Sequence, residues 1–176
     1  MKRIVLIFGL ISGAIMFVMM LGTLPFVDST WLQDRSMIVG YTTIVLSSLL
    51  IFFGIRSYRE NIGGGAISFG RAFAVGILIA LIAAILYVTT WEILYFGVPG
   101  FADKFLTMCT EHARRSGASV EEIKAELALL NNPFTNAALA FLEPFPVGLL
   151  VTLISALILR KKPTAPSGES PAPIAA

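Results

Sequence analysis

The sequence has little charge and only one cysteine, and each scarcity excludes a class of protein. Charged residues make up 14% of the 176 residues, against about 25% in soluble domains, so lipid rather than water surrounds most of the folded chain. Cys109 is the only cysteine, which excludes an intramolecular disulfide and a cysteine-rich metal site. A net charge of +2 without a concentrated basic patch excludes nucleic acid as a partner.

Catalytic motifs are scarce as well. Cys109 and His112, on either side of Glu111, offer two metal ligands, whereas structural zinc takes four and catalytic zinc three. His112 is the only histidine, and no group is placed to orient it in a triad. The glycines at 63–65 lack the Lys-Ser/Thr of a phosphate loop. We therefore expect no enzyme activity, no metal site and no cofactor.

What the sequence does contain is four long apolar runs. They cover residues 4–24, 37–55, 69–96 and 136–159. A helix rises about 1.5 Å per residue and the hydrocarbon core is about 30 Å thick, so each run is long enough to span it or nearly so. The pattern predicts an all-α integral membrane four-helix bundle over residues 1–162. A tail over 163–176, rich in Pro, Ala, Ser and Gly, is expected to be disordered.

The fourth run is interrupted by Glu143-Pro144-Phe145-Pro146. Pro144 and Pro146 lack an N–H, so carbonyls in the preceding turn lose their helical partners, and bare carbonyls are costly in lipid. One interpretation is that Glu143 satisfies this broken backbone while Glu92 reaches the interface. The alternative is that Glu92 and Glu143 meet and share a proton, because two carboxyls at low dielectric do not both ionise cheaply.

Small residues at helical spacing predict close helix packing. Gly9 and Gly13 form a GxxxG pair in the first run, and Gly76, Ala80 and Ala84 lie on one face of the third. Such faces let a second backbone approach closely in a membrane. We expect them to pack helices against one another, within the chain or between chains.

Residues 97–133 form the one long polar excursion. The pattern predicts an amphipathic helical hairpin between the third and fourth membrane helices, broken at Gly117, with Ser119 and Glu122 as a capping box. The apolar face of its second helix requires a cover from the bundle, the lipid surface or a partner. The residues of this face are Val120, Ile123, Leu127 and Leu130.

Basic residues gather in three segments, at the two ends of the chain and in the loop at 56–71. These segments hold eight of the thirteen basic residues: Lys2, Arg3, Arg56, Arg59, Arg71, Arg160, Lys161 and Lys162. The positive-inside rule then predicts a multi-pass protein of the bacterial inner membrane with both termini cytoplasmic, and Trp31, Trp91 and Tyr95 near the outer interface. Arg56, Arg59 and Arg71 either bind anionic lipid headgroups or only determine this topology.

Several motifs together resemble a known family. They are 52–59 (FFGIRSYR), 63–73 (GGGAISFGRAF), Tyr87 with Trp91-Glu92, and 143–149 (EPFPVGL). The chain resembles the bacterial four-span membrane family catalogued as domain of unknown function 4199, over roughly residues 4–160. The resemblance implies four spans with a polar excursion before the last. It implies no activity, substrate or catalytic residue.

Two functional hypotheses follow. The first is a small non-enzymatic membrane module that assembles with itself or a membrane-protein partner through the GxxxG-type faces and the helices at 101–131, with membrane lipid around it. A bundle of this size is expected to have little interior for a solute path. The second is a transporter or channel subunit in which Glu143, with Glu92, carries a proton at the proline-broken helix.

Overall fold

The computed structural model describes residues 1–26 and 29–161, with the backbone alone for 30–34 and 36. The predicted tail at 163–176 lies outside the described residues. The described residues form only helices, turns and one isolated bridge between Ile67 and Lys161. The helices are α1 (Lys2–Thr23), α2 (Thr30–Asn61), α3 (Phe69–Gly97), α4 (Phe101–Ser116), α5 (Val120–Ala128), α6 (Pro133–Leu142) and α7 (Pro144–Leu159), with the 3-10 turns η1 (Leu24–Phe26) and η2 (Leu129–Asn131).

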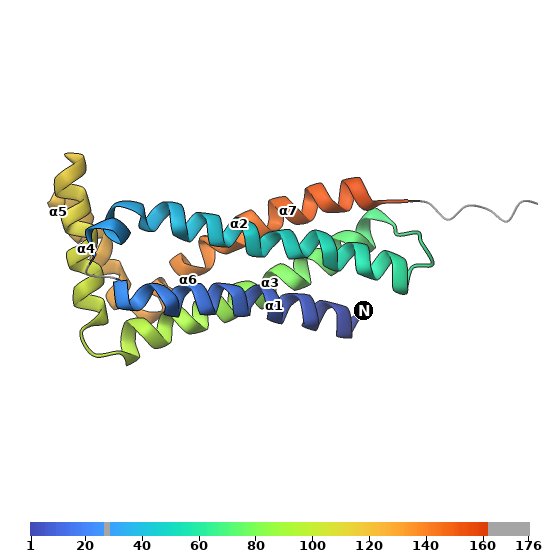
Figure 1. Cartoon of the computed structure of the whole chain (residues 1–176), viewed down its shortest axis with the longest axis horizontal. Helices are drawn as coiled ribbons and strands as arrows, with labels where there is room; N and C mark the ends of the chain where they lie inside the picture. The colour runs from blue at the N-terminus through green and yellow to red at the C-terminus, as the bar shows by residue number, and fades with distance from the viewer. Residues whose placement is uncertain (27–28, 162–176) are drawn as a thin grey trace, which may run out of the picture.

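Four helical segments are long and apolar enough to cross a membrane. They are Lys2–Phe26, Met37–Asn61, Phe69–Gly97 and Pro133–Leu159. The long helices lie side by side, whereas α4 and α5 lie across one end of them (Figure 1). The four predicted apolar segments are therefore confirmed as helices, and the chain has the character of a multi-pass membrane protein.

The second helix extends beyond the apolar run at 37–55 in both directions, and the part of it that is apolar enough to cross a membrane is Met37–Asn61. Helix α2 begins at Thr30 and continues to Asn61. An apolar run marks the part of a helix that suits lipid, and the helix itself continues until the backbone is interrupted. At the far end Arg56 and Glu60 form an i,i+4 ion pair, 2.8 Å between Nε and Oε1, which supports the extra turn.

The predicted small-residue faces pack inside the chain. A Cβ at Gly9 would lie 2.8 Å from Ile82 Cβ, and a Cβ at Gly13 would lie 2.4 Å from Leu86 Cδ1, so both glycines allow α1 to approach α3. On another side of α3, Gly76 faces Thr152 of α7, with 2.6 Å from its ideal Cβ to Thr152 Cγ2. Ala80 and Ala84 are buried on the same helix. These contacts place α3 between α1 and α7.

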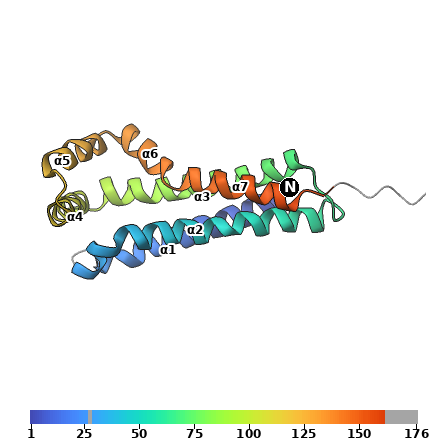
Figure 2. The same ribbon diagram turned by 90° about the horizontal axis from the view of Figure 1, so that it is seen from above.

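The three basic segments meet at the end of the molecule away from α4 (Figures 1 and 2). Ile67, in the connection between α2 and α3, exchanges two backbone hydrogen bonds of 3.0 Å with Lys161, just after α7. Val5 of α1, Ile55 of α2 and Leu159 of α7 are buried in one apolar cluster beside them. Backbone hydrogen bonds and aliphatic contacts therefore tie all four long helices together at this end.

The polar excursion has the predicted form. Helix α4 ends at Gly117, whose φ of 75° is a left-handed conformation that glycine adopts readily. Ser119 Oγ then accepts a hydrogen bond of 3.2 Å from the backbone N–H of Glu122 and so begins α5. The two short helices pack against each other, and α4 also packs against α3 and α2.

We predict that Gly13→Ala lowers the free energy of unfolding by about 1–3 kcal/mol, because the added methyl group overpacks the contact with Leu86. Gly22→Ala is the matched control on the same helix, since a Cβ there has no heavy atom within 4 Å. Circular dichroism during denaturation in mixed detergent micelles measures both. Equal stability of the two variants would show that α1 and α3 do not make this contact.

Candidate functional site

The fourth apolar segment is broken at Glu143. Helix α6 ends at Leu142 and α7 begins at Pro144, so the prediction of an interrupted segment is confirmed. The segment begins at Pro133 rather than 136, because Asn132 Oδ1 accepts hydrogen bonds from the N–H groups of Phe134 and Thr135. Helix α6 departs from the line of α7 and runs toward α5 (Figure 2).

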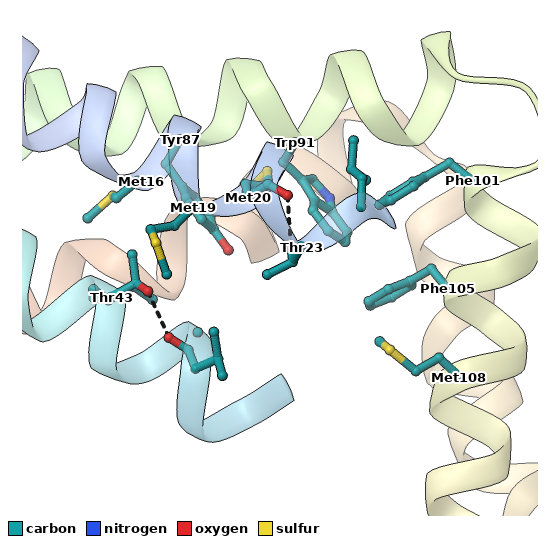
Figure 3. A pocket seen from close by; sticks show the side chains of 14 residues that line it. Met16, Met19, Met20, Thr23, Thr43, Tyr87, Trp91, Phe101, Phe105 and Met108 are labelled. Carbon is teal, nitrogen blue, oxygen red and sulfur yellow. Dashed lines mark hydrogen bonds between the residues drawn. The ribbon is translucent and has the colours of Figure 1, made fainter. Parts of the chain in front are cut away.

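A cavity of about 180 Å³ lies beneath α4. Phe101, Phe105 and Met108 occur at i, i+4 and i+7 on α4 and point into it (Figure 3). Met16 and Met20 of α1 line its side. Methionine side chains are flexible and polarisable, so this wall adapts readily to the shape of an apolar molecule.

A second cavity of about 490 Å³ adjoins the first on the side of α6. The two cavities share six lining residues: Gly40, Ile44, Tyr87, Trp91, Phe105 and Met108. Tyr41 of α2, Leu139 of α6 and Glu143 are exposed on its wall. The second cavity is therefore open to its surroundings between α2 and α6.

Two polar pairs tie α3 to α6 across the cavity wall. The hydroxyl of Tyr87 donates a hydrogen bond to the Glu143 carboxyl group. One turn further along α3, Trp91 Nε1 donates to Oδ1 of Asn136, which is fully buried and donates through Nδ2 to the Leu130 carbonyl at 3.0 Å. A buried amide with both ends bonded fixes its position in a way that apolar packing alone does not.

The contact between Glu92 and Glu143, which was the alternative interpretation of the broken segment, does not form. Glu143 accepts from Tyr87, whereas Glu92 has a buried oxygen, Oε1, for which the described residues offer no hydrogen-bond partner. Glu92 also takes no part in lining either cavity. The reason is rotational: Glu92 is one residue, or about 100°, around α3 from Trp91, and it is Trp91 that faces α6. Glu143 also forms no side-chain cap on the broken helix.

The other candidate residues do not converge on a site. Arg56 and Arg59 both contact Glu60, and Arg59 Nη1 also lies 3.5 Å from the Leu159 carbonyl. Arg71 is exposed in the first turn of α3. The described part of the chain contains no group of three or more His, Cys, Asp or Glu side chains arranged to hold a metal. Headgroup binding by the arginines stays a prediction.

Tyr87, Trp91 and Asn136 were not singled out as site residues by the sequence. Tyr87 and Trp91 follow the small-residue face of α3, and Trp91 was expected at the outer interface. The signal that could have identified them is their polar side-chain atoms within apolar segments, because such groups in lipid find hydrogen-bond partners inside the protein. The apolar face that α4 turns toward the cavity was also predictable from the i, i+4, i+7 spacing of Phe101, Phe105 and Met108.

Residues 7–161 match the family model described as "Protein of unknown function (DUF4199)". The chain belongs to this family. The match extends from α1 to the end of α7, so both cavities and the broken segment of this DUF4199 protein lie inside the matched region. No curated protein and no solved structure matches the chain.

Burial raises the pKa of the Cys109 thiol, on the wall of the larger cavity, to about 11. An ordinary thiol has a pKa of about 8.5, and only the thiolate reacts with alkylating reagents. We predict that the rate of alkylation by iodoacetamide is half-maximal at about pH 11 in the folded protein and at about pH 8.5 in the SDS-denatured chain. Mass spectrometry measures both rates. A half-maximal rate at about pH 8.5 in the folded protein would place Cys109 in water.

Proposed function

We propose that this DUF4199 protein is a four-helix bundle of the bacterial inner membrane that binds an apolar or amphipathic molecule in the cavities beneath α4. The observation that carries the proposal is the larger cavity, about 490 Å³ and open between α2 and α6. Ligand sites are typically clefts of about 300–1,000 Å³ with mostly apolar walls and a few convergent polar groups. Tyr87, Asn136 and Glu143 supply such groups here.

Assembly through the small-residue faces has less support. Gly9, Gly13 and Gly76 meet side chains of the same chain, so these faces are already occupied. The apolar residues Ile123 and Leu127 of α5 are half-buried, which leaves part of that face uncovered. Binding of an apolar or amphipathic molecule therefore has more support than assembly. In our proposal membrane lipid is the immediate partner and the source of ligands.

The proposed role is non-catalytic. On the wall of the larger cavity the carboxyl of Glu143 and the thiol of Cys109 are the groups suited to acid–base or nucleophilic chemistry. Burial raises the pKa of that thiol, which removes the thiolate that nucleophilic attack requires. The carboxyl group of Glu143 is already engaged by the Tyr87 hydroxyl, which donates a hydrogen bond to it.

The charge distribution supports one orientation. Basic residues gather at the end formed by the N-terminus, the α2–α3 connection and the end of α7. The positive-inside rule places this end in the cytoplasm. Helices α4 and α5, and with them the cavities, then face the outside.

We predict that Ala118→Cys is labelled in intact cells and Ile62→Cys only after lysis, both in a Cys109→Ser background. Both positions are exposed, Ala118 between α4 and α5 and Ile62 at the basic end. The measurement is labelling by a membrane-impermeant maleimide, and the pair controls for reactivity. The opposite pattern would invert the topology and place the cavities on the cytoplasmic side.

The binding proposal is tested by filling the cavity. Gly40 lines both cavities, and a Cβ there meets no heavy atom within 4 Å, so a leucine at this position starts from open space beside the cavities. In a Trp31→Phe background Trp91 is the remaining tryptophan and reports on the cavity wall. We predict that 1-bromodecane, a neutral apolar quencher, quenches Trp91 fluorescence saturably in lipid nanodiscs, and that Gly40→Leu abolishes the saturable part.

Gly70→Leu is the matched control, because Gly70 is also helical and also has no heavy atom within 4 Å of a Cβ. It lies at the start of α3, at the other end of the molecule, and should leave quenching unchanged. Quenching that rises linearly with bromodecane in every variant would reflect bulk lipid alone. That result would contradict the binding proposal.

A further inference from the structure

The larger cavity has a marked charge asymmetry. Among the described residues that line it, Glu143 is the only aspartate or glutamate, and none is lysine, arginine or histidine. The other titratable groups on the wall are Tyr41 of α2, Tyr87 of α3 and Cys109 of α4. Phenols and thiols do not supply positive charge, so these neighbours leave the carboxylate without a counter-ion.

The depth of Glu143 makes this asymmetry costly. The residue lies ten positions after the start of the segment Pro133–Leu159, which has 27 residues. At about 1.5 Å per residue this is roughly 15 Å from the end of the segment, within the hydrocarbon region. A carboxylate at such a depth requires a proton or a cation beside it. The hydrogen bond from Tyr87 orients the group but leaves its charge in place.

Aromatic rings surround the same space. Tyr41, Tyr87, Trp91 and Phe105 all line the cavity with Glu143. Trp91 and Phe105 pack edge to face, with 5.0 Å between ring centroids. The faces of aromatic rings attract cations, most strongly when the cation has lost its water. Rings together with one carboxylate therefore favour a positively charged group, whereas the apolar remainder of the wall favours a hydrophobic one.

We infer that this cavity binds a hydrophobic monovalent cation, such as a lipophilic amine, quaternary ammonium or phosphonium, with Glu143 as its counter-charge. This inference rests on the proposed binding function and names its ligand class. The cation enters between α2 and α6, its apolar substituents contact the methionine and aromatic wall, and its charge lies beside Glu143.

The test uses tetraphenylphosphonium and tetraphenylborate, which have nearly the same size and shape and opposite charge. Binding to the full chain in nanodiscs of zwitterionic lipid is measured by equilibrium dialysis, with empty nanodiscs as the baseline. We expect saturable binding of tetraphenylphosphonium, about tenfold or more tighter than that of tetraphenylborate. Equal binding of the two ions would overturn the inference, and this comparison needs no variant.

Variants identify the counter-charge. Glu143→Gln should weaken tetraphenylphosphonium binding by about tenfold or more. Glu143→Asp keeps the charge and should retain binding. Glu92→Gln is the matched control and should change nothing, because Glu92 lines neither cavity. Unaltered binding by a folded Glu143→Gln protein would exclude Glu143 as the counter-charge.

The same variants separate this inference from the function on which it rests. Glu143→Gln keeps the shape of the cavity, so saturable quenching of Trp91 by neutral bromodecane should persist while cation binding is lost. If bromodecane binds but tetraphenylphosphonium binds no tighter than tetraphenylborate, the proposed binding function stands and the inference of a cationic ligand is refuted. Absence of saturable binding for every probe would refute both.

Discussion

The arrangement of this protein depends on how closely α3 approaches its neighbours. At Gly76 an ideal Cβ would lie 2.6 Å from Thr152, and at Gly9 it would lie 2.8 Å from Ile82, so neither contact leaves room for a side chain on α3 or α1. In lipid, helices gain nothing from hiding apolar surface, and such van der Waals contact is what holds them together. Further along α3 the small residues give way to Tyr87 and Trp91. The helices diverge where these large side chains begin, and the cavities lie there.

The break at Glu143 and the two polar pairs together determine the position of α6. Helix α6 departs from the line of α7 and still packs against α3. The hydrogen bonds from Tyr87 to Glu143 and from Trp91 to Asn136 hold α3 and α6 in register. Membrane hydrogen bonds of this kind contribute on average about 0.6 kcal/mol each. Their effect is therefore more to set the position of α6 than to stabilise the fold as a whole.

Features determined within one or two helical turns were predictable from the sequence. The Gly9–Gly13 spacing, the end of α4 at Gly117 and the interruption at Pro144 depend on near neighbours in the chain, and the structure contains all three. The bounds of α2 were not predictable from hydropathy, which records suitability for lipid and not where a helix ends. The Tyr87–Glu143 pair joins residues 56 positions apart and depends on the rotation of two helices about their own axes. The spacing of residues within either helix does not specify how the two helices are rotated relative to each other.

The backbone bridge between Ile67 and Lys161 has a mechanical consequence. Its two hydrogen bonds fasten the α2–α3 connection to the end of α7 at the basic end, whereas α4 and α5 are joined to the long helices at the opposite end through side-chain packing. The wall of the cavities is held instead by contacts between side chains, such as Trp91 with Asn136 and Trp91 with Phe105. The two ends of the bundle are therefore joined in different ways, by backbone hydrogen bonds at the basic end and by side chains beside the cavities.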